Sequence, residues 1–405
     1  MKIIHVIPSV ALLRGGPSQA VLETVKALRN LGIDAEIVTT NDNENNLLDV
    51  PLYKLIEYKQ VPVRFFPRFS PNVHSIREFA FSSQLTAWLW KNITKYDLLH
   101  VHAIFSYTST AAMAIARLQN VPYIVRPLGQ LCEWSLQQSA RKKQIYLNLI
   151  EQANLNNSQA LHFTSAQEQE EVSRLNFKVP NFVLPHGLSI PPAIPYARSY
   201  LRQYLNLPSD EPIILFLSRL HPKKGLDYLI PALSKISSHR FTFVIAGSGS
   251  KEYEAEINSL LVASGMSGRT HFAGFVEGET KNMFMQGSDL FVLTSYAENF
   301  AVVVLEALAV GLPVLITPGV ALASIVQQYQ LGYVTPMNVS AIASALENYL
   351  SHPQKAKQMG ERARQIISEQ YTWDKIAARM IDNYKTIIYN NAAANSKALA
   401  NSKPR

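Results

Sequence analysis

The feature that most constrains this chain is an alternation of short apolar runs with longer segments of helical periodicity, which occurs twice. Apolar runs rich in Val and Ile that alternate with amphipathic helices are typical of a parallel sheet covered by helices. In the first half of the chain the predicted strands are 3–7, 35–39, 98–102, 123–126, 160–164 and 182–185. In the second half they are 213–218, 241–246, 270–273, 290–294, 313–316 and 332–334. The repeat predicts an α/β fold of two Rossmann-like, doubly wound domains.

Chain length and the proline pattern set the domain boundaries. A chain of 405 residues exceeds what one hydrophobic core usually serves, and three prolines between residues 187 and 195 make a continuous helix or central strand there improbable. The predicted domains are therefore 1–188 and 196–371. A final amphipathic helix at about 372–389 is expected to pack back on the first domain. The Asn/Ala/Ser/Lys tail 390–405 is predicted to be disordered, because it has little apolar surface to bury.

Composition and cysteine content exclude several classes of protein. A hydrophobic fraction of 47% and a charged fraction of 17% are those of a folded globular chain. The chain has no run of 18 apolar residues, so no membrane-spanning helix is predicted. His5 and Pro8 interrupt the apolar N-terminus, which favours a buried strand over a signal peptide. Cys132 cannot form an intrachain disulfide and no Cys/His cluster has zinc-site spacing, so a cytoplasmic location is expected.

The net charge of +8 is concentrated in part in the segment 59–95, which carries six basic residues against one acidic residue, Glu78. Phenylalanine and tryptophan are interleaved with these charges, a mixture that suits an anionic membrane surface. The same pattern fits a solvated face over ordinary core aromatic residues. No nucleic acid is expected as a partner, because no DNA- or RNA-binding motif accompanies the charge.

Ligands of open parallel sheets bind beyond the carboxyl ends of the strands, so the residues after each predicted strand are candidate site residues. Gly15 and Gly16 follow the first strand and precede a helix, where backbone N–H groups can approach a phosphate or simply form a tight turn. His102 ends the strand 98–102 and shares a strand face with His100. It can contact a sugar hydroxyl or a phosphate, or it can be a structural residue.

In the second half, two motifs carry charge at strand ends. Arg219 and Lys224 flank a predicted helix start, where a guanidinium and an ammonium can converge on a diphosphate, with Lys223 as a solvated neighbour. Glu298 precedes an almost wholly apolar segment in which Glu306 is the one charged residue. If the whole segment were helical, the two carboxylates would lie about 12 Å apart along the axis, which suits sugar hydroxyls at one and ribose hydroxyls at the other. The alternative is two unrelated glutamates, with Glu306 in an internal salt bridge.

Taken in order, these motifs resemble those of the family 4 glycosyltransferases, over about residues 2–385 and including the extension 307–313. The resemblance implies the GT-B fold, in which two Rossmann-like domains face each other across a deep cleft. It implies retaining, metal-independent transfer of a hexose-type sugar from a nucleotide-diphosphate sugar to a hydroxyl of a glycan or lipid-linked acceptor. Cell-surface polysaccharide synthesis, with the enzyme peripheral on the cytoplasmic face of a membrane, is the expected setting.

The resemblance also implies roles for individual residues. The expected catalytic residues are Arg219, Lys224, Glu298 and His102. Arg219 and Lys224 would stabilise charge on the leaving diphosphate, Glu298 would position the sugar, and His102 would contact the donor sugar from the opposite domain. The expected donor-binding residues are Gly15, Gly16, Val276, Phe300, Ala301 and Glu306, with Val276 near the base and Glu306 on the ribose. No metal site and no cofactor are expected, and no Asp-x-Asp motif is visible.

The sequence departs from the family pattern at two positions. Ala301 stands where many relatives carry Gly, and His186-Gly187 replaces a more usual Asn-Gly. Arg126, in an Arg-Pro-Leu-Gly loop, is a further candidate for substrate contact. The sequence does not support a nicotinamide dehydrogenase, because the dinucleotide-binding motif Gly-x-Gly-x-x-Gly is missing after the first strand. A nucleotide-sugar epimerase and a non-catalytic nucleotide-sugar-binding protein share the architecture and stay as alternatives.

Overall fold

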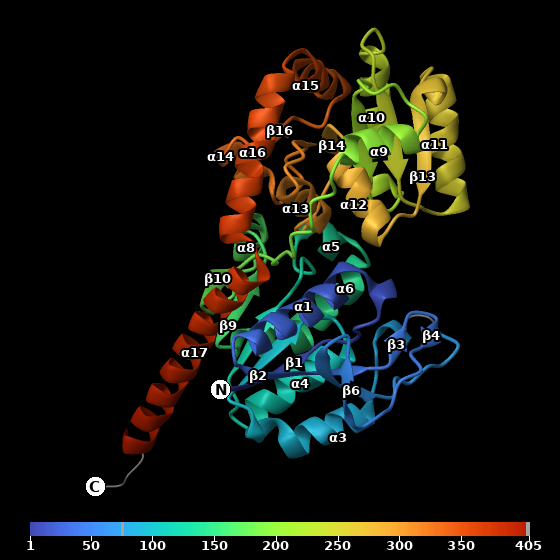
Figure 1. The fold of residues 1–405 in the computed structure, drawn as a ribbon. Helices are drawn as coiled ribbons and strands as arrows, with labels where there is room; N and C mark the ends of the chain where they lie inside the picture. Colours follow the sequence, from blue (N-terminus) through green and yellow to red (C-terminus); the bar gives the residue numbers. More distant parts are fainter. Residues whose placement is uncertain (74–76, 402–405) are drawn as a thin grey trace. The chain divides into compact units, whose positions relative to one another are not determined.

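The computed structural model describes residues 1–73 and 77–401, with side chains up to residue 393. The chain forms two compact units, of which the first comprises Met1–Gly187 and Trp373–Arg405 and the second Leu188–Thr372 (Figure 1). Each unit is an α/β fold built on its own sheet, as the sequence predicts.

The first unit is built on an eight-stranded sheet of order β10-β9-β8-β7-β1-β2-β6-β5, parallel except for the edge pair β5 and β6. Its strands are β1 (Lys2–Val6), β2 (Asp34–Thr40), β5 (Leu55–Tyr58), β6 (Val61–Phe66), β7 (Leu98–His102), β8 (Tyr123–Arg126), β9 (Ala160–Phe163) and β10 (Asn181–Val183). A small hairpin joins β3 (Asp42–Asn43) to β4 (Asn46–Leu47). The central strands β1 and β7 are almost entirely buried, because helices cover both faces of the sheet.

Some helices of the first unit begin at a serine that caps the first turn. Ser106 and Ser165 each accept a hydrogen bond from a backbone N–H in the first turn of the helix that follows. The helical segments are η1 (Leu12–Arg14), α1 (Gly16–Asn30), α3 (Ser83–Asn92), η2 (Ile93–Lys95), α4 (Tyr107–Leu118), α5 (Glu133–Gln137), α6 (Ala140–Tyr146), η3 (Leu147–Glu151), α7 (Gln152–Asn156), α8 (Ala166–Ser173) and α17 (Trp373–Asn401).

The segment 59–95 contributes more to the fold than its charge pattern indicates. Strand β6 places Phe65 and Phe66 in the core, and Pro62 within this strand obscures its period in the sequence. Arg68 is buried against Asp42, and the Arg64 guanidinium lies over the Trp88 ring at 4.8 Å. Much of the interleaved charge and aromatic surface is therefore structural.

The second unit is a six-stranded, fully parallel sheet of order β13-β12-β11-β14-β15-β16. Its strands are β11 (Ile213–Leu217), β12 (Thr242–Ala246), β13 (Thr270–Gly274), β14 (Leu290–Leu293), β15 (Val314–Ile316) and β16 (Gly332–Val334). Its helical segments are α9 (Ala197–Tyr204), η4 (Pro222–Lys224), α10 (Leu226–Lys235), α11 (Lys251–Ala263), η5 (Ser267–Arg269), α12 (Gly278–Gly287), α13 (Val302–Ala309), α14 (Ala323–Gln328), α15 (Val339–Ser351) and α16 (Pro353–Gln370). The strand order reverses between β11 and β14, which is the usual ligand position in such a sheet.

The C-terminal helix α17 belongs to the first unit, where Ile376, Met380 and Tyr384 join the core beside α1. These residues recur at helical spacing along one face. The helix runs on to Asn401, which corrects the disordered tail expected from residue 390, while 402–405 lie outside the described residues. The physical reason is helix propensity, since the tail carries alanine at 392–394, 398 and 400, and alanine favours the helix without burying apolar surface.

Candidate functional site

The carboxyl ends of β11 and β14 bring Lys224 and Glu298 together. Lys224 ends the short helix η4 after β11, and its ammonium donates to the Glu298 carboxylate at 2.6 Å. Gly225 makes this approach possible, because it adopts φ +70° and a Cβ there would lie 1.9 Å from the Thr294 carbonyl oxygen. The Thr294 hydroxyl donates to the Gly225 carbonyl at 2.8 Å and fixes the two loops together.

The backbone around Glu298 is extended and not helical. The Glu298 N–H donates to the Gly319 carbonyl at 2.7 Å, and the Ala321 N–H donates to the Glu298 carbonyl at 3.1 Å. Helix α13 begins at Val302, so the assumption that one helix links Glu298 to Glu306 is wrong. Glu298 forms an isolated parallel β-bridge with Val320, which keeps the backbone at Glu298 extended.

Ala301 and Phe300 lie between Glu298 and the start of α13. Ala301 is the N-cap of the helix and adopts the left-handed conformation with φ 56°, while Phe300 is buried in the core of the second unit. A left-handed alanine is strained relative to glycine, which gives the Ala-for-Gly departure a physical consequence. The N-terminus of α13 carries no side-chain cap.

Glu306 lies within α13 and pairs with a residue that the sequence did not single out. Lys281 of α12 donates to one Glu306 oxygen at 2.6 Å, and both side chains stay about a quarter exposed. Glu306 is therefore in a salt bridge, but one that leaves part of the carboxylate accessible to a ligand. Val276 is half-buried in the loop between β13 and α12.

Arg219 lies directly beyond β11 and is exposed. Within residues 1–73 and 77–401, its guanidinium has no hydrogen bond or ion pair. Arg219 therefore offers an uncompensated positive charge at the same sheet edge as Lys224.

In the first unit, Gly15 and Gly16 begin α1. Gly15 adopts φ +79° and no side chain caps the helix, so the first-turn N–H groups keep no cap acceptor. A Cβ at either glycine would meet nothing within 4 Å, so the loop is open to an approaching group. These features suit an anion at the helix N-terminus.

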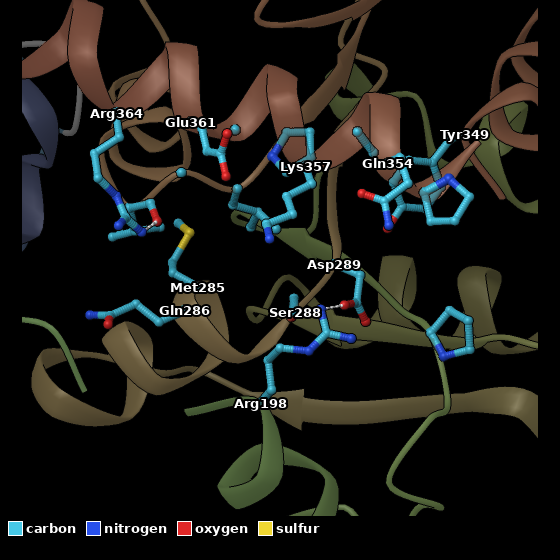
Figure 2. Close-up of a pocket in the computed structure, with 18 of the residues that line it drawn as sticks. Arg198, Met285, Gln286, Ser288, Asp289, Tyr349, Gln354, Lys357, Glu361 and Arg364 are labelled. Carbon is cyan, nitrogen blue, oxygen red and sulfur yellow. Dashed lines mark hydrogen bonds and ion pairs between the residues drawn. The ribbon is translucent and has the colours of Figure 1, made fainter. Parts of the chain in front are cut away.

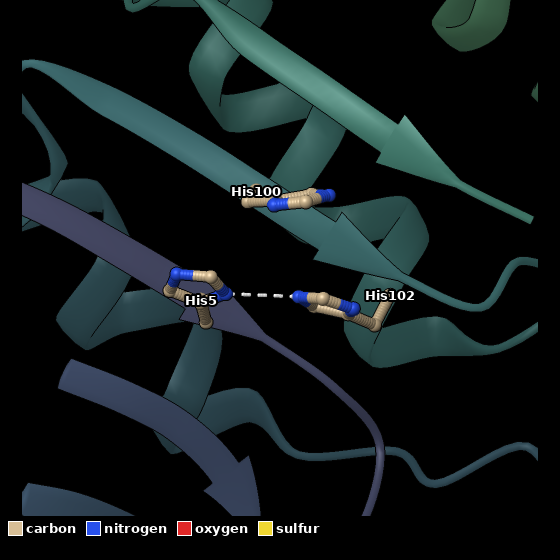
Figure 3. A group of neighbouring side chains, drawn as sticks. All are labelled: His5, His100 and His102. Carbon is tan, nitrogen blue, oxygen red and sulfur yellow. Dashed lines mark hydrogen bonds between the residues drawn. The ribbon is translucent and has the colours of Figure 1, made fainter. Parts of the chain in front are cut away.

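His102 is placed in a buried cluster of histidines. Figure 3 shows His5, His100 and His102 with the His5 Nδ1 and His102 Nε2 atoms joined by a hydrogen bond of 2.9 Å. The His100 and His102 rings stack with centroids 4.4 Å apart. His102 is 1% exposed, which is the environment of the structural histidine that the sequence left as an alternative.

The electrostatics of this cluster keep the rings neutral. Burial and then the Arg126 charge lower the pKa of His5 to about 3, and burial also holds the pKa of His100 and His102 well below the usual range. His162 extends the chain of bonds by contacting His100 at 3.3 Å and the Leu184 carbonyl at 2.8 Å. Stacked rings, mutual hydrogen bonds and a neighbouring guanidinium define a hydrogen-bonded packing cluster.

Two family models match the chain along most of its length. Residues 15–187 match a "Glycosyl transferase 4-like domain" and residues 198–366 match "Glycosyl transferases group 1". The chain belongs to the family 4 type of GT-B glycosyltransferases. The family resemblance stated from the motifs is thereby confirmed, as is the fold class.

Among its relatives, this glycosyltransferase is 34% identical over 187 residues to MJ1607 of Methanocaldococcus jannaschii, a glycosyltransferase. That match covers 45% of this chain and 47% of the archaeal protein, so it spans about half of each. The D-inositol 3-phosphate glycosyltransferase of Xylanimonas cellulosilytica is 26% identical over 383 residues, 91% of each chain. Sucrose-phosphate synthase of Thermosynechococcus elongatus has a similar fold, with a TM-score of 0.75, 21% identity and coverage of 96% and 100%.

A pocket of about 610 Å³ in the second unit of this glycosyltransferase lies away from these residues. Pro212, Asp289 and Pro313 line it and directly precede β11, β14 and β15, so it opens at the amino ends of the strands. Figure 2 shows Lys357 and Arg364 of α16 along one wall and Asp289 with Arg198 on the other. Asp289 is already paired with Arg198 and Arg202, so its carboxylate is engaged within the protein.

Sequence reasoning missed several residues of the site. Lys281 carries no spacing signal, since its partner Glu306 is brought to it only by the packing of α12 beside α13. Asp42 could have been found, because it follows β2 almost directly and so obeys the strand-end rule. It forms an ion-pair network with Arg14 and Glu78 at the edge of the first sheet.

Proposed function

We propose that the chain transfers a hexose-type sugar from a nucleotide-diphosphate sugar to a hydroxyl of a glycan or lipid-linked acceptor, with retention of anomeric configuration. The observation that carries the proposal is the meeting of Lys224 and Glu298 at the switch point of the second sheet, with exposed Arg219 at the same edge. Glu306 follows along α13 with an accessible carboxylate.

The diphosphate of the donor is the proposed ligand of Lys224 and Arg219. Lys224 is paired with the Glu298 carboxylate, Arg219 adds a second positive charge at the same sheet edge, and the uncapped N-terminus of α13 adds a partial positive charge. An arriving diphosphate would therefore meet net positive potential. In transfer, these groups stabilise the charge that develops on the leaving diphosphate without exchanging a proton with it.

The bond changes balance without a cofactor. The bond from the anomeric carbon to the diphosphate oxygen breaks, and a bond from the acceptor oxygen to the same carbon forms on the same face. The acceptor proton passes to the leaving diphosphate, and a nucleoside diphosphate departs. Glu298 positions the sugar near the anomeric centre, and Glu306 accepts hydrogen bonds from the ribose hydroxyls.

A metal is not required in this proposal, because Arg219 and Lys224 supply the charge that a divalent cation would otherwise supply. The test is calorimetry of the full chain with UDP, GDP and ADP and their sugars, with and without EDTA. We expect one nucleotide series to bind selectively and EDTA to leave its affinity unchanged. Failure of every nucleotide to bind would overturn the proposal, and loss of binding in EDTA would overturn its metal-free form.

A peripheral association with the cytoplasmic face of a membrane is part of the proposal. No helix among the described residues has the length and apolarity to cross a bilayer. Exposed basic and aromatic residues of the segment 59–95 include Lys59, Phe69, Phe81, Trp90, Lys91 and Lys95. Co-sedimentation with anionic liposomes at low salt tests this part, and equal sedimentation of wild type and Trp90→Ser would contradict it.

A further inference from the structure

The pocket of about 610 Å³ in the second unit is a candidate binding site apart from the residues proposed for sugar transfer. It lies wholly within the second unit, between α16 and the amino ends of β11, β14 and β15. Lys224 and Glu298, in contrast, follow the carboxyl ends of β11 and β14. The volume falls within the roughly 300–1,000 Å³ that is usual for pockets that take small molecules. The proposed function makes no use of this pocket.

One part of the pocket carries more basic than acidic side chains. Asp289 forms ion pairs with both Arg198 and Arg202. Lys357 is exposed on α16, lines the same pocket and has no hydrogen bond or ion pair within residues 1–73 and 77–401. Figure 2 shows the Lys357 side chain extending from α16 toward the wall that carries Asp289 and Arg198. One carboxylate cannot neutralise three cations, so a net positive charge is left at this wall.

The other carboxylates of the lining do not cancel that charge. Asp210 is paired with Arg240, which also pairs with buried Glu211. Glu361 lies one turn beyond the lysine along α16, and it has no ion pair among the described residues. With Arg364 included, five basic side chains stand against four acidic ones in and directly behind the lining. The balance favours an anion near the lysine and leaves Glu361 as an acceptor for hydroxyl groups.

The ends of the helices around the pocket add to this potential. No side chain caps the N-terminus of the 18-residue helix α16, where residues 353–354 line the pocket. The first N–H groups of a helix carry a partial positive charge. The carbonyl ends of two neighbouring helices are engaged by arginines. Arg364 donates to the Val310 carbonyl after α13 at 2.6 Å, and Arg202 donates to the Gly287 carbonyl of α12 at 3.0 Å.

The lining also contains a buried hydroxyl group without a partner. Tyr349 of α15 is 7% exposed and lines the pocket, and its hydroxyl has no hydrogen bond to any other residue that the structure describes. Buried polar groups are nearly always hydrogen-bonded, so this hydroxyl indicates a partner that comes from the pocket. Burial raises the pKa of Tyr349, which keeps the hydroxyl neutral and able to donate.

We propose that this pocket binds the phosphate monoester of a small polyhydroxylated molecule, such as a hexose phosphate. The phosphate, with a charge of about −1.5 to −2 at neutral pH, lies between Lys357 and Arg198 at the start of α16 and accepts from the Tyr349 hydroxyl. Arg198 has N–H groups beyond the one that bonds Asp289. The hydroxyl groups of the ligand donate to Glu361. None of these residues takes part in the proposed transfer, so the inference does not depend on it.

Calorimetry of the full chain with four probes tests the ligand class. The probes are mannose 6-phosphate, inorganic phosphate, mannose and dihexanoyl phosphatidic acid. We expect mannose 6-phosphate to bind about tenfold more tightly than inorganic phosphate, and mannose not to bind. Absence of mannose 6-phosphate binding would overturn the inference. Equal affinity for inorganic phosphate would overturn its polyhydroxylated part, and tighter binding of the lipid would assign the phosphate to a lipid headgroup instead.

Two variants place the bound phosphate in this pocket. Lys357→Ala should weaken mannose 6-phosphate binding by at least about tenfold, and the matched control is Lys355→Ala, an exposed lysine of α16 outside the lining. Tyr349→Phe should weaken binding about three- to tenfold without lowering Tm, because the hydroxyl has no partner among the described residues. Unchanged affinity in Lys357→Ala would overturn the site, and unchanged affinity in Tyr349→Phe would overturn the role of the hydroxyl.

The same titration with a saturating nucleotide separates this inference from the proposed function. We expect mannose 6-phosphate to bind with unchanged affinity when the nucleotide is present. Competition between the two ligands would place the sugar phosphate at the donor site and overturn the inference. If no nucleotide binds, the proposed function fails, while the comparison of Lys357→Ala with Lys355→Ala still decides whether this pocket takes the phosphate.

Discussion

Lys224 and Glu298 form an ion pair of 2.6 Å with both side chains 14% exposed, although 74 positions separate them in the chain. The pair is set by backbone contacts on both sides, through Gly225 against Thr294 and through Glu298 against Gly319. In a donor-free enzyme Glu298 therefore holds the lysine in place. In the proposed function, an arriving diphosphate would share that lysine.

Replacing Lys224 by Ala should mainly slow transfer. If the ammonium stabilises charge on the leaving diphosphate, we expect kcat to fall by about 10²–10³-fold with a small change in donor KM. Steady-state kinetics with the donor identified by calorimetry give both values. Lys223→Ala is the matched control, and equal losses in the two variants would contradict the specific role of Lys224.

Replacing Glu306 by Ala should mainly weaken donor binding. The variant loses the hydrogen bonds that the ribose hydroxyls would donate to the Glu306 carboxylate. We therefore expect the KM for the nucleotide sugar to rise by about ten- to a hundredfold, with kcat nearly unchanged. Glu279→Ala, an exposed carboxylate on α12, is the control. A fall in kcat at constant KM would place Glu306 in the chemical step and contradict the assignment.

Much of the fold could be predicted from the sequence, because buried parallel strands have a strong local signal. All twelve expected strands are present. The strands missed are the two-residue hairpin β3–β4 and the antiparallel pair β5–β6, in which Pro62 interrupts β6. A continuous run of apolar residues identifies a strand that is buried on both faces, but a half-exposed strand at the edge of a sheet has no such run. The prediction of disorder from residue 390 was wrong because it considered only how little apolar surface the tail can bury and not the helix propensity of its alanines.

The candidate site was predicted as separate motifs, and the sequence could not give their contacts. Strand-end position singled out Lys224 and Glu298 separately and did not pair them, because their ion pair depends on the close loop packing at Gly225. The Glu306–Lys281 pair depends on how α12 and α13 pack. The burial of His102 depends on rings from several strands of the first sheet, which no local pattern reports.

Ala301→Gly should stabilise the second unit. Ala301 adopts φ 56°, where a Cβ is strained, so glycine is expected to gain about 0.5–1 kcal/mol in the free energy of unfolding after its own entropy cost. Differential scanning calorimetry measures the effect. Ala297→Gly is the control and should destabilise, because Ala297 does not have a positive φ. Equal shifts in both variants would contradict the strain at Ala301.

The histidine cluster predicts acid sensitivity of the first unit. The cluster comprises His5 on β1, His100 and His102 on β7, His162 on β9 and His186, and it is faced by Arg126 on β8 and Tyr384 on α17. Because the pKa values of these histidines are lower in the folded state, the unfolded state binds more protons below pH 6.5. Stability is therefore complete above that pH and is lost as the pH falls towards the folded values, by up to about 1.4 kcal/mol per pH unit for each histidine.

Urea unfolding between pH 4.5 and 8 tests this prediction. All four tryptophans, Trp88, Trp90, Trp134 and Trp373, lie in the first unit, so their fluorescence reports that unit alone. His5→Asn preserves a hydrogen-bond partner for His102 and should remove about one histidine's share of the slope. A stability that does not change between pH 5 and 7 would contradict the neutral cluster.

Retaining sugar transfer is tested most directly by proton NMR of a reaction between the full chain, the nucleotide sugar that it binds and a matching acceptor. Retaining transfer releases one nucleoside diphosphate for each new glycosidic bond, and the anomeric proton of the product then shows the same configuration as that of the donor. A product of inverted configuration would contradict retention. No product from any donor that binds, across neutral and charged acceptors, would contradict sugar transfer itself.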